Sequence, residues 1–312
     1  LAASLLASAE ELSAPGFAGR IDPDQARRYL DATADPSFLT RLEYPRLTDR
    51  WAETAFRFIQ AAGYSLLDMF EDRVRSNGSR VLFRDMSGPA FSEWTYSEAA
   101  ARIRQIAGVF YLLTGDREPR VALFSENHLD IACSDLACLF YGIFVTPLNP
   151  HFTADNLAMV FEKLGINIVV TDTPRRAELA REASRRTSGP VSVISVNRMP
   201  GDEAGQEFLG ELILGTRRDV DEALSVRPGR DLDRVCTVMF TSGSTGVPKG
   251  VSFSAYNLIS KRFARAAALP DVGRDEVLLS FLPLYHTFGR FFELLGTIFW
   301  RGTYVLSGNP SA

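Results

Sequence analysis

From residue 64 onward, short runs of β-branched and apolar residues alternate with longer segments whose apolar residues recur every three or four positions. Residues 166–171 are the clearest of the short runs, and such a run is typical of a strand that is covered on both faces. Strands that alternate with amphipathic helices form a mostly parallel sheet with helices on both sides. The predicted fold class is therefore α/β, with mostly parallel sheets flanked by helices.

Capping residues mark where several helices begin. Thr95 and Glu98 form a capping box, in which the hydroxyl accepts from the Glu amide and the carboxylate reaches back. Thr48, Ser65 and Thr153 precede further helical segments. The predicted helices span residues 23–30, 49–62, 95–113, 129–140, 153–164, 207–214 and 290–300, with another opening at residue 65. The predicted strands span residues 80–83, 120–124, 144–147, 166–171, 191–196, 235–240 and 303–306.

The patterning divides the 312 residues into three segments. Residues 1–62 are predicted to be a helical N-terminal leader, in which an amphipathic helix docks on the part that follows. Residues 63–230 are predicted to form an α/β subdomain, and residues 231–312 the start of a second, truncated one. Residues 197–234 lose the apolar period, so we expect a surface connection there with one short helix.

Charge and cysteine content exclude several classes of protein. The net charge of −4 argues against a nucleic-acid partner, because phosphate contacts need clustered Lys and Arg. Three cysteines without C-x-x-C spacing indicate a reducing compartment, here predicted to be the cytoplasm, and no metal site. Residues 1–9 have no preceding basic region, and prolines break the uncharged run 136–154. Neither a signal peptide nor a transmembrane segment is therefore expected.

The most informative segment follows the strand predicted at residues 235–240. It combines three glycines, four hydroxyls, a proline and one of only three lysines in the chain. Glycines let backbone amides form a concave nest around an anion, hydroxyls add donors, and a lysine adds a positive charge suited to phosphate. The segment is therefore predicted to bind a polyphosphate. Its residues are Thr241, Ser242, Gly243, Ser244, Thr245, Gly246, Val247, Pro248, Lys249 and Gly250.

Two common nucleotide-binding patterns do not fit this segment. A Walker loop requires G-x-x-x-x-G-K-[ST], whereas Lys249 lies between Pro248 and Gly250. The segment also lacks the G-x-G-x-x-G fingerprint of dinucleotide-binding proteins. A motor-type or GTPase-type nucleotide hydrolase and a nicotinamide dehydrogenase are thus disfavoured.

The segment instead resembles the phosphate-binding signature of the adenylate-forming enzymes, which include acyl-CoA synthetases, luciferases and adenylation domains. Four further segments resemble motifs of this family, in the family's order, from residue 64 to the end. "H-x-F-G-R" at residues 286–290 and the apolar stretch after it are most similar to the long-chain fatty acyl-CoA synthetases. The four segments are Trp94–Glu98, Arg120–Asn127, Gly142–Pro150 and Leu282–Gly289.

This resemblance implies an activity and a set of site residues. Family members activate a carboxylate with ATP to an acyl-adenylate, release pyrophosphate, and mostly pass the acyl group to CoA. Residues 241–246 and Lys249 would hold the β- and γ-phosphates with Mg²⁺, for which Thr241 is the candidate ligand. His286 would lie beside the acyl pocket, near the developing adenylate, and the alternative is a histidine that is hydrogen-bonded in the core.

The sequence leaves several interpretations of the substrate and of the activity open. The apolar residues at 291–300 would suit the channel of a fatty acyl tail, or they pack as ordinary core. The family's adenine, ribose and hinge motifs, and the small C-terminal domain with its adenylation lysine, do not occur in these 312 residues, so we expect the chain alone not to adenylate. A fatty acyl-AMP ligase that loads a carrier protein and a non-catalytic nucleotide- or lipid-binding module are the alternatives. Peripheral membrane contact and the oligomeric state also stay open.

Overall fold

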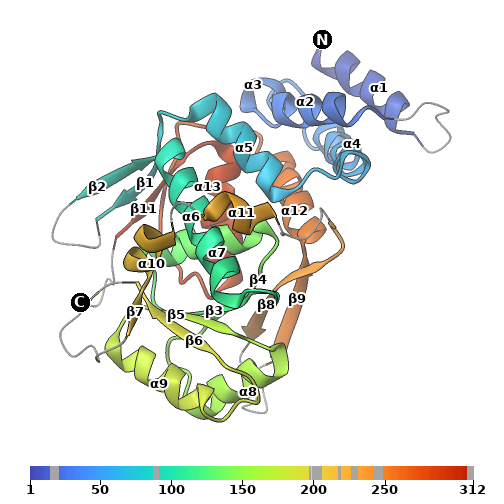
Figure 1. Ribbon diagram of the computed structural model, residues 1–312. Coiled ribbons are helices and arrows are strands. Elements are labelled where there is room, and N and C mark those ends of the chain that lie inside the picture. Colours follow the sequence, from blue (N-terminus) through green and yellow to red (C-terminus); the bar gives the residue numbers. More distant parts are fainter. Residues whose placement is uncertain are drawn as a thin grey trace.

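The computed structural model describes residues 1–14, 21–86, 91–196, 198, 206–216, 219–225, 231–241 and 249–307. Its strands form a seven-stranded and a four-stranded sheet (Figure 1). The seven-stranded sheet has the order β7-β6-β5-β3-β4-β8-β9, and the four-stranded sheet has the order β10-β11-β1-β2. Only β9 in the larger sheet and β2 in the smaller one pair antiparallel with their neighbours. The predicted α/β class with mostly parallel sheets is confirmed.

The strands of the larger sheet are β3 (Arg120–Phe124), β4 (Phe144–Leu148), β5 (Ile168–Thr171), β6 (Ser192–Ser195), β7 (Glu207–Phe208), β8 (Val235–Thr241) and β9 (Lys249–Ser254). Those of the smaller sheet are β1 (Val81–Asp85), β2 (Ser92–Thr95), β10 (Val277–Leu279) and β11 (Thr303–Leu306). Each sheet combines strands from both sides of residue 230. The boundaries of the three expected segments stay predictions.

The helices of the first half are α1 (Ala2–Ser13), α2 (Pro23–Thr33), α3 (Pro36–Leu39), α4 (Arg46–Ala62), α5 (Leu66–Asn77), α6 (Tyr96–Thr114), α7 (Leu129–Tyr141) and α8 (Ala154–Leu164). Those of the second half are α9 (Pro174–Ser184), α10 (Leu209–Thr216), α11 (Val220–Ser225), α12 (Ala255–Ala268), the π-helix η1 (Phe288–Leu294) and α13 (Leu295–Trp300). No helix within the described residues is long and apolar enough to cross a bilayer.

The larger sheet is buried on both faces because successive side chains of a strand point to opposite sides. In β3, Val121 and Leu123 belong to the main core, whereas Ala122 and Phe124 join a second apolar cluster with residues of α8 and α9. Helix α7 packs on β3 and β4, and α6 packs on α7 and on β1 and β2. Helices α6 and α7 therefore lie between the two sheets, and α8 and α9 cover the outer face (Figure 1).

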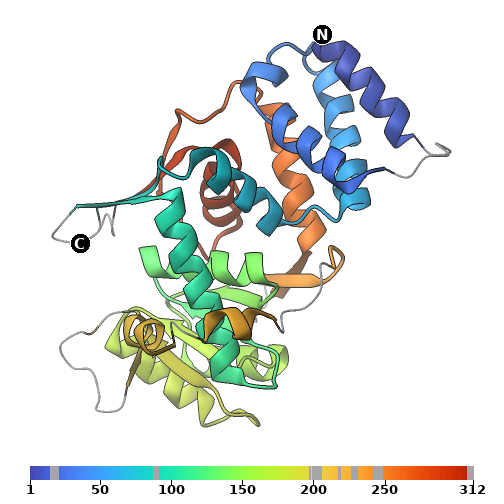
Figure 2. The same ribbon diagram turned by 45° about the horizontal axis from the view of Figure 1, so that its top comes forward.

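Helices α1–α4 lie at one end of the molecule, beside α12 (Figure 2). Trp51 of α4 is fully buried, and its ring lies 5.7 Å from that of Phe263 in α12. One predicted cap is wrong. Thr48 does not precede the helix but lies in its first turn, where its hydroxyl donates to the Pro45 carbonyl. The predicted end at Gly63 is confirmed, since this glycine adopts the left-handed conformation that closes helices.

Residues 197–234 contain more structure than expected. Besides α10, the described part includes the edge strand β7 and a second helix, α11. Val220 of α11 packs so closely against α6 that a Cβ built on Gly108 would lie 2.9 Å from its methyl groups. With 6 residues α11 is too short to show a clear helical period in the sequence, although Val220, Ala223 and Leu224 are buried.

Candidate active site

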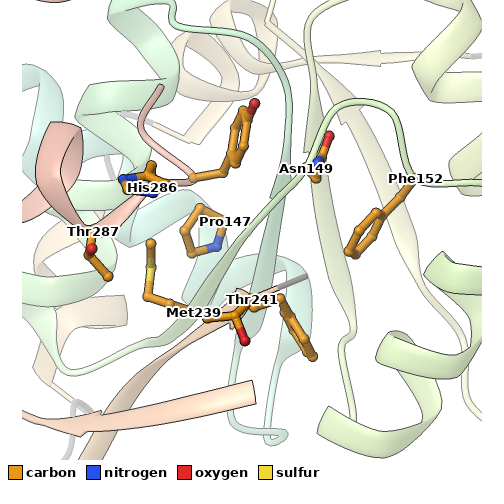
Figure 3. A pocket seen from close by; sticks show the side chains of 9 residues that line it. Pro147, Asn149, Phe152, Met239, Thr241, His286 and Thr287 are labelled. Atoms are coloured by element: carbon orange, nitrogen blue, oxygen red, sulfur yellow. The ribbon is translucent and has the colours of Figure 1, made fainter. Parts of the chain in front are cut away.

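The candidate site lies at the carboxyl edge of the larger sheet, where parallel α/β sheets commonly bind ligands. β4 and β8 are parallel neighbours, so the residues at their ends come together. A cavity of about 440 Å³ opens there. Asn149 and Phe152, which follow β4, face His286 and Thr287 across this cavity, with Met239 and Thr241 of β8 along another side (Figure 3).

Thr241 and Lys249 are the two predicted phosphate-binding residues that the structure describes. They face each other as the last residue of β8 and the first of β9, and the Thr241 hydroxyl donates to the Lys249 carbonyl at 3.3 Å. Both side chains are exposed, and Thr241 lines the cavity. Lys249 thus begins a strand that the sequence analysis did not predict. The other predicted residues, Ser242, Gly243, Ser244, Thr245 and Gly246, lie outside the described residues.

His286 is exposed and lines the cavity, so it is not a core histidine. Its Nδ1 accepts a long hydrogen bond of 3.4 Å from the Phe288 amide. Because Nδ1 accepts this bond, Nε2 is the ring nitrogen that can donate to a ligand oxygen. Tyr285 lines the same cavity, and burial, followed by the negative charge of Glu126, raises the pKa of its phenol. The Tyr285 phenol therefore keeps its proton at neutral pH and can also donate to a ligand.

Asn127 fixes the segment that leads to His286. Its side-chain amide donates to the Ser280 hydroxyl at 2.9 Å and to the Leu282 carbonyl at 3.0 Å, and its oxygen accepts from the Leu284 amide at 2.8 Å. Three bonds from one side chain after β3 thus hold a chain segment more than 150 residues away. The sequence analysis included Asn127 in a family-like segment but gave it no role.

Arg290 and Asp135 form a buried ion pair under the site, and sequence reasoning missed it. Both side chains are 0–1% exposed, and two parallel bonds of 2.5 and 2.7 Å join them. Arg290 also donates to the Thr237 hydroxyl at 2.6 Å, so the pair connects η1 with α7 and β8. A charged residue within an otherwise apolar helix, such as Asp135, is the signal that could have indicated a buried pair. Its partner could not be read from the sequence.

The apolar stretch after His286 is largely core. It begins as the π-helix η1 rather than as the α-helix predicted from residue 290. Leu294, Leu295, Ile298 and Phe299 are at most 1% exposed within the main core. Ordinary core packing is therefore the correct interpretation for these residues, whereas Phe291 borders a second cavity.

Gly289 permits the close approach of η1 to the segment before His286. A Cβ at this position would lie 2.6 Å from the carbonyl oxygens of both Leu282 and Pro283, which belong to the backbone. We expect Gly289→Ala to lower the free energy of unfolding by about 1–3 kcal/mol through overpacking, as measured by urea denaturation. Gly215→Ala is the matched control, because Gly215 also lies in a helix and no described atom outside the adjoining residues and that helix's backbone lies within 4 Å of its Cβ. An equal effect of both substitutions would contradict the steric argument.

The Thr241 hydroxyl and the Lys249 ammonium group are better suited to bind a polyphosphate than to hold a metal ion through protein ligands alone. The described residues contain no group of three His, Cys, Asp or Glu side chains placed to hold a metal. Mg²⁺ is commonly bound through substrate phosphates together with few protein ligands. A magnesium ion at this edge would accordingly bind through the phosphates, with the Thr241 hydroxyl as the candidate protein ligand, whereas the exposed Lys249 ammonium group would contact the phosphates themselves.

Several curated ligases are similar in sequence to this chain. A long-chain-fatty-acid–CoA ligase 5 of Rattus norvegicus is 29% identical over 196 residues, which cover 58% of this chain and 28% of the relative. The long-chain-fatty-acid–CoA ligase ACSBG1 of Mus musculus is 25% identical over 308 residues, covering 97% of this chain and 41% of the relative. A crotonobetaine/carnitine–CoA ligase of Salmonella paratyphi B is 26% identical over 236 residues, which cover 72% of this chain and 43% of the relative. The chain thus spans less than half the length of these relatives.

Solved structures show the same fold. Apo MatB from Rhodopseudomonas palustris superposes with a TM-score of 0.64 at 24% identity, covering 78% of this chain and 45% of that structure. The anthranilate CoA ligase AuaEII in complex with anthranoyl-AMP gives a TM-score of 0.67 at 13% identity, with the same coverage. The family model described as AMP-binding enzyme matches residues 70–312. The resemblance to adenylate-forming enzymes is confirmed, and the chain belongs to the AMP-binding enzyme family.

Proposed function

We propose that the protein containing this chain is an AMP-forming acid–thiol ligase that converts a carboxylic acid, such as a fatty acid, into its CoA thioester. The observation that carries the proposal is the cavity at the carboxyl edge of β4 and β8, where Thr241 and His286 meet beside the β8–β9 hairpin. Relatives described as CoA ligases support the acid–thiol chemistry.

The proposed first step is an in-line attack by a carboxylate oxygen on the α-phosphorus of ATP. A C–O–P linkage forms, the bond to the β-phosphate oxygen breaks, and pyrophosphate leaves with the electron pair. Lys249 and the backbone amides of residues 242–246 neutralise the phosphate charge, so their contribution is positioning and electrostatic stabilisation. His286 donates from Nε2 to an oxygen of the reacting carboxylate or adenylate. The CoA thiol then attacks the acyl carbon and displaces AMP.

Exchange of labelled pyrophosphate into ATP tests the first step. We expect the complete protein to catalyse this exchange only when a carboxylic acid substrate is present, and to form acyl-CoA when CoA is added. The 312-residue chain alone is expected to give no exchange, because the family motifs for adenine and ribose do not occur in it. Acid-independent ATP hydrolysis, or an acyl-adenylate that reacts only with a carrier protein, would contradict the proposed reaction.

A further inference from the structure

A second cavity, of about 590 Å³, lies between β9, α12 and the start of η1. Apolar side chains form part of its wall, with the rings of Phe253 and Phe291 in edge contact at 5.1 Å. Cationic side chains from one face of α12 form another part, namely Lys261, Arg262 and Arg265. None of the described residues that line it is acidic. The cavity therefore combines an apolar wall with an uncompensated positive charge.

Arg262 is the unusual member of this group. Its side chain is 1% exposed, and only its Nη1 is bonded, to the Phe291 carbonyl. Its Nε and Nη2 are buried without a hydrogen-bond partner within the part of the chain described here. Burial, followed by the charge of Arg265, lowers the pKa of Arg262 to about 9, and no carboxylate acts in the opposite direction. A buried guanidinium without an anion is costly, so its retention calls for a partner.

Arg265 extends the same positive face one turn further along the helix. Its guanidinium carbon lies 4.8 Å from the ring centroid of Phe292, which orients the group, and its Nε has no partner among the described residues. Burial alone lowers its pKa. Two guanidinium groups three residues apart can together bind one carboxylate through several charge-assisted bonds.

Thr287 borders both this cavity and the candidate active site. It lines the cavity that contains His286 and Thr241, and it also lines the cavity that contains Arg262. A ligand whose reacting carboxylate lies beside His286 can therefore extend past Thr287 along Phe288 and Phe291. Its far end would meet the guanidinium groups.

We propose that the Arg262 cavity binds the distal anionic group of the acyl substrate, so that the preferred acids are α,ω-dicarboxylates rather than simple fatty acids. This inference rests on the proposed function, because it assigns the substrate class of that same site. The apolar wall would contact the methylene chain, and Arg262 with Arg265 would bind the second carboxylate. A plain alkyl end would leave both guanidinium groups unpaired.

The test measures dissociation constants by calorimetry at constant ionic strength, using pairs of acids with equal carbon number. Glutarate is compared with pentanoate, and hexadecanedioate with hexadecanoate. Because a charge-assisted hydrogen bond contributes about 1.5–3 kcal/mol, we expect the dicarboxylate of at least one pair to bind about 10- to 100-fold more tightly. Equal affinity within both pairs, or no binding of any dicarboxylate, would overturn the proposal.

Variants identify the residues responsible. Arg262→Met is expected to abolish the preference for the dicarboxylate and to leave the melting temperature of the ligand-free chain unchanged or higher, since a buried unpaired charge is removed. Arg265→Met, which keeps the Arg262 bond to Phe291, is expected to reduce the preference as well. Arg41→Met is the control, because Arg41 is exposed outside both cavities. A dicarboxylate preference that persists in both cavity variants would contradict the assignment.

Three further outcomes separate this inference from related ones. Arg262-dependent binding of inorganic phosphate without any preference for dicarboxylates would overturn the assignment to an acyl substrate. Pyrophosphate exchange that responds to monocarboxylates alone would refute the inference and leave the proposed function intact. Tight, Arg262-dependent binding of a dicarboxylate without pyrophosphate exchange in the complete protein would refute the proposed function and leave the assignment of the Arg262 cavity intact.

Discussion

Asp135→Ala is expected to lower the free energy of unfolding by about 3–5 kcal/mol, because it leaves Arg290 buried without its counter-charge. Both partners are essentially inaccessible to water, and the two bonds between them are short. The loss is a large part of the stability of a typical domain. Urea denaturation followed by circular dichroism measures it directly.

Two controls separate charge burial from mere loss of a contact. The double variant Asp135→Leu with Arg290→Met removes both charges and is expected to recover much of the stability, since buried ion pairs can often be replaced by apolar residues of similar size. Glu178→Ala breaks the exposed pair with Arg175, whose side chains are 62% and 71% exposed, and should change stability by less than about 1 kcal/mol. A single variant as stable as the wild type would show that the pair is not a structural link.

Lys249→Ala is expected to slow adenylation by the complete protein about 10²- to 10³-fold, the loss commonly seen when one preorganised electrostatic contact to the transition state is removed. The fold should remain intact, because the Lys249 side chain is exposed at the start of β9 and contributes little to packing. Pyrophosphate exchange measures the rate, and thermal unfolding verifies the fold.

Lys163→Ala provides the matched control for this prediction. Lys163 is an exposed lysine in the last turn of α8, away from the hairpin. Its removal should leave the exchange rate unchanged within experimental error. A rate of pyrophosphate exchange in Lys249→Ala equal to that of the wild type would contradict the role assigned to the hairpin.

Local signals in the sequence were sufficient for most helices and for the buried strands. Ser65, Thr95 and Thr153 each cap a helix as predicted, because a hydroxyl and the residue three positions later satisfy the free amides of the first turn. The strand at Arg120–Phe124 has the predicted bounds. These features depend on neighbours along the chain, and such neighbours are visible in the sequence.

Some features that were not predicted, such as helices α9 and α12, do carry local capping signals, whereas others depend on distant partners. β9 is mostly exposed, so it lacks a strong apolar period, and its identity comes from antiparallel pairing with β8. The four-stranded sheet joins β1 to β11, more than 200 residues later, and no local pattern specifies that register. For the same reason the second cavity was not foreseen. In the sequence Arg262 cannot be distinguished from other helical arginines, because its environment is formed by residues of β9 and η1 that are distant in the chain.

A crystal structure of the chain with ATP and magnesium tests the central claim most directly. The account predicts that the β- and γ-phosphates contact the amides of the turn that joins β8 to β9, with the Lys249 ammonium group beside them. A triphosphate bound elsewhere, or amides in that turn already paired with protein groups, would contradict the assignment of an ATP-dependent ligase.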